Sequence, residues 1–211
     1  SGSIPACSLH SLFSSAFALR AYACAGQDRR LPALKGNKKL IYAALFAALC
    51  CVITMYPKFP TLFGYIHAGD ALVLLGAYVL GPLWGALAAA LGSSLADLMA
   101  GYVQYFPGTF VTKAVMSLIA GALLLKFGEK RPVLTTVLAG LAAECVMILG
   151  YFAYEGLLLG YGWGAAGSIP TNIVQGIFGA AASSALFAAL IKTPYARREL
   201  GLSFNRDPDK R

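Results

Sequence analysis

The chain has 211 residues, of which 58% are hydrophobic and only 12% are charged. Soluble domains carry about a quarter charged residues, so this composition excludes an ordinary soluble protein. A membrane span needs roughly 20 apolar residues, so the region from Leu40 to Ile191 has room for about six spans and little else. The sequence therefore predicts an all-α membrane protein without a separate soluble catalytic domain.

The first element in the chain is a tail, residues 1–38, which is mildly apolar but interrupted by polar residues and is not a clean signal peptide. We expect this tail to be poorly ordered or left over from cloning. The membrane domain is predicted over residues 39–192, and residues 193–211 form a basic tail. Six spans are expected, at about Leu40–Tyr56, Ile66–Leu80, Leu83–Gly101, Phe106–Phe127, Pro132–Tyr154 and Ser168–Lys192. The second span is short and is expected to be tilted or to cross only partly.

Lysine and arginine predict the orientation. Fifteen of the 17 basic residues lie before the first span, around the junction of the fourth and fifth spans from Lys126 on, or from Lys192, the last residue of the sixth span, onward. With six spans, these three regions face one side of the membrane. The other side has only Lys58, and Lys113 lies within a span. Because basic loops stay in the cytoplasm, both termini are expected to be cytoplasmic in a bacterial inner membrane.

The placement of charged residues and cysteines excludes some classes of ligand. The net charge of +8 does not indicate nucleic-acid binding, because the basic residues do not follow one face with interleaved aromatics. The five cysteines show no CxxC or Cys/His spacing, so no metal, disulfide or cofactor is expected.

Polar side chains from five spans fall at a similar depth once the orientation is set. Ionisable groups in a bilayer normally face an interior, where they are paired or hydrated. Tyrosines lie at the outer rim of the same region, and aromatic rings with a few polar anchors are typical of a pocket for a flat ring compound. The candidate substrate-binding residues are Asp70, Asp97, Tyr102, Tyr105, Thr109, Lys113, Glu144, Tyr151, Asn172 and Gln175.

Each of these residues also has a purely structural interpretation. Lys113 is expected to pair with Asp97 or Asp70, and that pair could serve only to hold helices together. Asn172 and Gln175 share a helix face and could form interhelical hydrogen bonds. The tyrosines could form an interfacial belt. Glu144 could relay a proton or be a carboxyl satisfied by packing.

The first span carries two overlapping Ala-x-x-x-Ala pairs, formed by Ala43, Ala44, Ala47 and Ala48. Small residues at this spacing make a smooth helix face that allows close contact with another helix. The face packs either inside the protein or against a partner membrane subunit.

Several short motifs occur in an order that is similar to a known family. They are Gly69-Asp70-Ala71, Gly81-Pro82 with Gly85, Gly92–Asp97, Pro107–Phe110 with Lys113, and Pro170-Thr171-Asn172 with Gln175. Together, over about residues 38–192, they resemble the substrate-binding S components of energy-coupling factor (ECF) vitamin transporters. The similarity is greatest to the branch for riboflavin, hydroxymethylpyrimidine or pyridoxine-type substrates.

The resemblance implies a six-helix subunit that binds a vitamin or precursor from outside and performs no chemistry. It also implies partners, namely a transmembrane coupling subunit and two cytoplasmic ATPases. The family's first-helix alanine face meets the coupling subunit, and its first external loop, here about residues 57–65, covers the ligand. The long N-terminal tail departs from the family's usual short start.

Other functions compete with this one. The chain has no GxxxxGK[ST] sequence, so ATP hydrolysis is expected to come from a partner. A self-sufficient proton-coupled carrier that uses Asp97, Lys113 and Glu144 is the alternative. An intramembrane enzyme is disfavoured, because the sequence lacks HExxH, GxSxG and paired-aspartate motifs.

Overall fold

The computed structural model describes residues 37–56, 58–61, 64–200 and 202. Of the predicted tail at residues 1–38, only Asn37 and Lys38 are described, and they begin the first described helix. Of the C-terminal tail, residues 201 and 203–211 lie outside the described residues. The described elements, in chain order, are α2 (Asn37–Met55), β1 (Lys58–Thr61), β2 (Gly64–His67), α3 (Gly69–Leu80), α4 (Pro82–Met99), α5 (Phe106–Phe127), α6 (Pro132–Ala153), α7 (Ile169–Leu190) and α8 (Pro194–Arg198). A π-helical turn, Tyr154–Leu158, extends α6, and 3₁₀ turns at Val103–Tyr105 and Gly162–Ser168 precede α5 and α7.

Helices α2 to α7 match the six predicted stretches to within three residues at every boundary. Proline stands in the first turn of α4, α5, α6 and α7. There it removes an N–H that has no partner within the helix, and its φ already suits one. Between α3 and α4, Gly81 adopts a φ of 85°, a left-handed value that glycine reaches without strain. The sharp reversal at this glycine sets α3 against α4.

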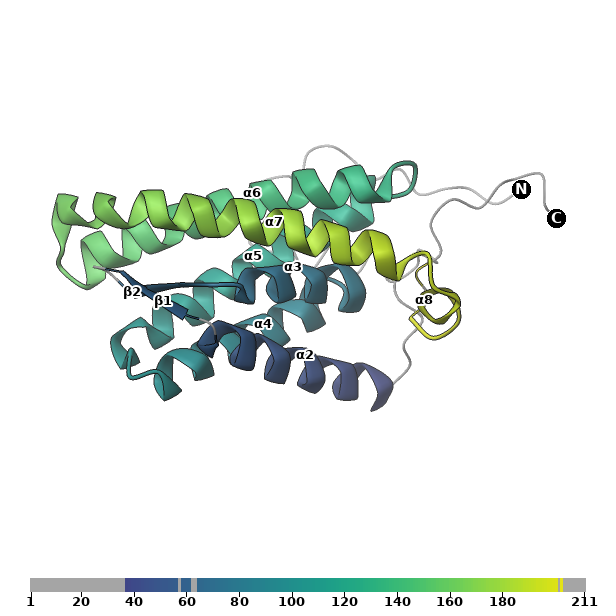
Figure 1. Ribbon diagram of the computed structural model, residues 1–211, viewed down its shortest axis with the longest axis horizontal. Coiled ribbons are helices and arrows are strands. Elements are labelled where there is room, and N and C mark those ends of the chain that lie inside the picture. The colour runs from purple at the N-terminus through teal and green to yellow at the C-terminus, as the bar shows by residue number, and fades with distance from the viewer. Residues whose placement is uncertain (1–36, 57, 62–63, 201, 203–211) are drawn as a thin grey trace, which may run out of the picture.

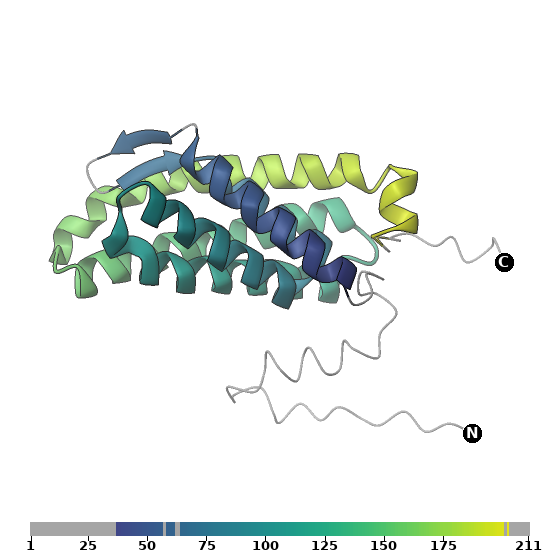
Figure 2. The ribbon, with the colours of Figure 1, turned by 90° about the horizontal axis from the view of Figure 1, so that it is seen from below.

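The helices lie along the long axis of an elongated bundle, with the hairpin toward one end and α8 at the other (Figure 1). The view turned by 90° shows α2 crossing one face of the bundle obliquely (Figure 2). Because successive helices alternate in direction, the start of α2, the α5–α6 connection and α8 lie at the same end. Among the described residues, this end carries Lys38, Lys39, Lys130, Arg131, Lys192 and Arg198.

Four helical segments are long and apolar enough to cross a membrane, namely Asn37–Met55, Val103–Phe127, Pro132–Leu158 and Gly162–Leu190. Helix α3 has only 12 residues, or about 18 Å at 1.5 Å per residue, which is shorter than a hydrocarbon core of about 30 Å. Helix α4 is not among the four. The protein is therefore a multi-pass membrane protein, and six complete spans remain a prediction.

The outward faces of the helices are apolar. On α4, leucines at intervals of four residues are exposed, at Leu83, Leu87, Leu91 and Leu95. Ionisable side chains such as Asp70, Lys113 and Glu144 are buried instead. A surface of this kind, with polar groups inside and leucine outside, suits lipid rather than water.

A two-stranded hairpin interrupts the helical chain after α2. Strands β1 and β2 are antiparallel, with Lys58 opposite His67 and Thr61 opposite Gly64. The sequence led us to expect an external loop here, at about residues 57–65. Strand β2 leads directly into α3, so the hairpin lies at the end of the bundle where Asp70 begins its helix (Figure 1).

Candidate functional site

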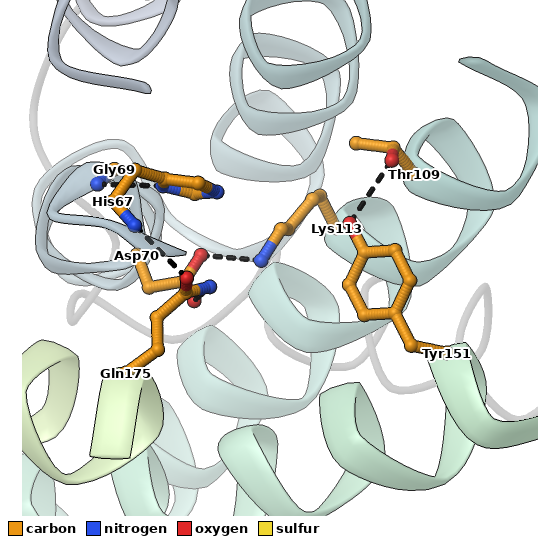
Figure 3. A network of polar contacts seen from close by, with 7 residues as sticks. All are labelled: His67, Gly69, Asp70, Thr109, Lys113, Tyr151 and Gln175. Atoms are coloured by element: carbon orange, nitrogen blue, oxygen red, sulfur yellow. Dashed lines mark hydrogen bonds and ion pairs between the residues drawn. The ribbon is translucent and has the colours of Figure 1, made fainter. Parts of the chain in front are cut away.

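A buried ion pair lies between α3 and α5. The ammonium group of Lys113 contacts Oδ1 of Asp70, and both side chains are almost fully shielded, with 0% and 1% exposed. The sequence left Asp70 and Asp97 open as partners of Lys113, and the structure selects Asp70 (Figure 3). A lysine enclosed in this way requires a counterion, because an unpaired charge away from water is costly.

Gln175 of α7 connects this ion pair to the hairpin. Its Nε2 donates to Oδ2 of Asp70 at 2.7 Å, and its Oε1 accepts from the backbone N–H of His67 at 3.1 Å. The Nδ1 atom of His67 accepts from the backbone N–H of Gly69 at 3.0 Å. Figure 3 shows these contacts as one continuous network. Three helices and strand β2 are thus joined through a single amide and a single carboxylate.

Tyr151 of α6 extends the network on the other side of Lys113. Its hydroxyl shares a hydrogen bond of 2.9 Å with Thr109 Oγ1, and its ring centroid lies 5.5 Å from the Lys113 ammonium. At this distance a ring attracts a cation through its quadrupole. Two predicted site residues, Thr109 and Tyr151, therefore lie beside the buried lysine (Figure 3).

Tyrosines cluster next to this network. The ring of Tyr105 lies 6.3 Å from that of Tyr102, 6.5 Å from that of Tyr151 and 6.4 Å from that of Tyr154, measured between centroids. The Tyr105 hydroxyl donates to Oε1 of Glu155 at 3.3 Å. Aromatic rings at this spacing form an apolar wall with hydroxyl groups at its edge.

Glu144 of α6 is the other buried acid near Asp70. Glu144 is only 3% exposed, and neither of its carboxyl oxygens has a hydrogen-bond partner among the described residues. It lies against two glycines of α7. A Cβ atom at Gly179 would be 2.7 Å from its Oε1, and one at Gly176 would be 3.2 Å from its Oε2.

The remaining predicted residues lie at the margins of the network. Asp97 is buried in the last turn of α4, and its backbone carbonyl accepts from the N–H of Tyr102 at 2.8 Å. Asn172 is half-buried in the first turn of α7. The structure thus brings most predicted residues together between α3, α5, α6 and α7, and their contact with a ligand stays a prediction.

Sequence reasoning did not select His67, Gly176 or Gly179. His67 lies close to the start of the second predicted span, where a histidine is ordinarily solvated, but it is half-buried and bonded within the network. The two glycines follow Gln175 as a Gly-x-x-Gly pair, and this spacing on one helix face was the available signal.

The alanine face of α2 is divided by the structure. Ala43 is buried and Ala47 is half-buried, with the Ala47 carbonyl close to Gly92 of α4. Ala44 and Ala48 are exposed. One half of the face therefore packs inside the bundle, and the other half is open to lipid or to a partner.

Comparison with known proteins shows similarity to a transporter family and to a protein of Pyrococcus woesei. Residues 36–192 match the model of the family described as "ECF-type riboflavin transporter, S component". The chain is also 37% identical over 119 residues to an uncharacterized protein of Pyrococcus woesei, described as lying in the gap 3′ region. That match covers 55% of this chain and 75% of the archaeal protein.

Proposed function

Since the chain belongs to the family of ECF-type riboflavin transporter S components, we propose that it captures a B vitamin or vitamin precursor outside the cell for uptake driven by partner ATPases. As an S component it is a substrate-binding subunit of a transporter. Riboflavin is the first candidate ligand, because of the family description. Pyridoxine-like and hydroxymethylpyrimidine-like heterocycles are the others.

One observation supports this proposal above the rest. Polar and aromatic side chains from α3, α5, α6 and α7 converge beside strand β2. The hairpin that contains β2 lies toward the end of the bundle opposite α8 (Figure 1). With the basic regions in the cytoplasm, this end faces outward. A tyrosine wall beside a few fixed polar groups suits a flat heterocycle.

The first experiment is ligand identification. The purified chain is analysed by native mass spectrometry for a bound small molecule, and is then titrated with riboflavin, pyridoxine and hydroxymethylpyrimidine. Binding of one of these compounds with submicromolar Kd is expected. A protein that binds none of them would contradict the proposed substrate class.

The second experiment concerns the source of energy. Vesicles that contain this chain together with a coupling subunit and two ATPases are expected to accumulate the vitamin only when ATP is supplied inside. The alternative is a proton-coupled carrier, in which the buried carboxyl of Glu144 would relay the proton. Uptake by the chain alone, driven by a proton gradient, would establish that alternative.

Asn172 tests the position of the site. Replacing Asn172 by alanine is expected to weaken vitamin binding about tenfold, because one or two hydrogen bonds of about 0.5–1.5 kcal/mol each would be lost. Replacing Ile173, the exposed residue next to it, by alanine is the matched control. Equal affinities for the two variants, measured by titration, would remove Asn172 from the site.

A further inference from the structure

The buried polar side chains in and beside the network differ in whether their oxygen and nitrogen atoms have hydrogen-bond partners. Both carboxyl oxygens of Asp70 are engaged, one by Lys113 and one by Gln175. The amide of Gln175 is engaged at both its nitrogen and its oxygen. Each polar group of Asp70, Lys113 and Gln175 thus has at least one partner within the protein, and these contacts connect α3, α5, α7 and β2.

Glu144 is in the opposite situation. Both of its oxygens are buried, and neither meets a donor in the described part of the chain. Buried polar atoms are nearly always hydrogen-bonded, and leaving one unpaired is costly. Glu144 therefore differs from Asp70 and Gln175, whose polar atoms all have a partner, and its two oxygens are suited to a hydrogen bond from a bound ligand.

The surroundings of Glu144 are built to keep the carboxyl group in place. It projects from α6 toward α7, where Gly176 and Gly179 present no side chain. A Cβ at Gly179 would lie 2.7 Å from Oε1 of Glu144 and 2.9 Å from Cβ of Asp70. The glycine pair thus reserves room for both acids at the junction of α3, α6 and α7.

The charges around Glu144 indicate which kind of ligand group would bind there. The nearby cation is Lys113, and its ion pair is made with Asp70. A second acid at this junction favours a ligand group that supplies a hydrogen, from a neutral or cationic N–H or O–H, over an anionic group.

We propose that Glu144 accepts a hydrogen bond from the bound ligand and so selects compounds with an N–H or O–H donor, whereas Asp70 and Gln175 hold the helices. This inference rests on the proposed function, since it assigns a role within the same binding site. It predicts that ligand donors and residue 144 are energetically coupled.

The test pairs a change in the protein with a change in the ligand. Wild-type full-length chain, Glu144→Leu and Glu144→Gln are titrated with riboflavin, with its N3-methyl derivative, and with lumiflavin, which lacks the ribityl hydroxyls. If pyridoxine is the vitamin that binds, pyridoxine and its 3-O-methyl ether form the pair. Cys145→Leu, at an exposed position next to Glu144 on the same helix, is the control.

The expected result is selective. Glu144→Leu lowers affinity for the parent vitamin about tenfold or more, but lowers affinity for one of the donor-lacking analogues less than twofold. Glu144→Gln keeps a neutral acceptor and reduces the ratio of the affinity for the parent vitamin to that for the analogue at least threefold. If Glu144→Leu does not fold, this ratio for Glu144→Gln is the result that tests the inference. Cys145→Leu leaves the ratio unchanged.

Two results would overturn the inference. If the Glu144 variants weaken all ligands equally, or weaken none, residue 144 has only a structural role, while the vitamin-binding function stands. If the wild-type chain binds none of the vitamins, the proposed function fails and the inference fails with it. The wild-type titration therefore separates the two failures.

Discussion

At the scale of single residues, the buried ion pair is the strongest constraint in the bundle. Lys113 and Asp70 are both removed from solvent, and each depends on the other for compensation of its charge. Gln175 orients the carboxylate and also holds the backbone of His67. The same few side chains therefore stabilise the fold and position the candidate site beside them.

Replacing Lys113 by methionine is expected to destabilise the protein by about 3–5 kcal/mol, because Asp70 would be left as an unpaired buried charge. The double variant Lys113→Met with Asp70→Asn has no charge at either buried position and is expected to recover most of the lost stability. Thermal unfolding in detergent measures both. If the single and double variants unfolded at the same temperature, the pair would not be a mutual constraint.

At the scale of elements, each helix has a lipid-facing side and an interior side. On α4 the exposed leucines recur every four residues, which places them on one face. Helix α2 differs, because its exposed side combines apolar residues with the small side chains of Ala44 and Ala48. A smooth strip of this kind allows another helix to approach closely.

If this half of the alanine face docks the coupling subunit, Ala48→Trp should abolish ATP-driven uptake and leave vitamin binding intact. Leu87→Trp, on the exposed face of α4, is the matched control and should leave uptake in place. Vesicle uptake and ligand titration are compared for both variants. Normal uptake by Ala48→Trp would show that the partner docks elsewhere.

The C-terminal segment is attached to the start of α2. Lys38 Nζ donates to Glu199 Oε2 at 2.9 Å, and the hydroxyls of Tyr42 and Tyr195 contact each other. Ala196, Leu200 and Leu202 are buried in the core. Helix α8 therefore folds back against the bundle instead of extending away from it.

The hydrogen bond and the charge of Lys38 lower the pKa of Glu199 below its ordinary value of 4.5. A depressed carboxyl pKa adds stability above the unfolded-state pKa, and that contribution disappears as the pH falls through the folded-state value. Hydrogen exchange in residues 194–200 is therefore expected to rise slightly when the pH drops below 4.5. Glu199→Gln should show raised exchange already at neutral pH, once rates are corrected for pH. Identical behaviour of the variant and the wild type would exclude a role for this ion pair.

At the scale of the whole molecule, the two ends of the bundle have different compositions. The hairpin, with the buried network beside it, lies toward one end, and the start of α2, the α5–α6 connection and α8, with their described lysines and arginines, lie at the other. The positive-inside rule predicts that the basic end faces the cytoplasm. This polarity would present the candidate site to the outside, where a vitamin arrives.

Cysteine labelling tests this orientation. A membrane-impermeant maleimide should label Gly164→Cys in intact cells, and should label Lys130→Cys only after the cells are permeabilised. Both positions are exposed. Gly164 lies between α6 and α7, and Lys130 lies between α5 and α6, at the opposite end of the bundle. The parent chain provides the background for its own cysteines. The reverse pattern of labelling would invert the topology and place the site inside.

Much of this organisation could be predicted from local sequence. Runs of apolar residues bounded by Pro, Gly or Lys predicted α2 to α7 to within three residues, because span length and helix ends depend on neighbours along the chain. The hairpin was not predicted. Its strands pair Lys58 with His67 in a segment that the sequence predicted only as an external loop, because this segment carries no clear alternation of apolar and polar residues.

By itself, the sequence determined the membrane class, the positions of the helices and the family, and it predicts the orientation. These follow from composition, from the distribution of charge and from short motifs, all of which can be counted along the chain. Only the tertiary structure decided that Lys113 pairs with Asp70, that Gln175 bridges to the hairpin and that Glu144 has no hydrogen-bond partner among the described residues. The reason is geometric, since the partner of a side chain depends on how each helix is rotated about its axis, and that rotation is set by the packing of all the helices together.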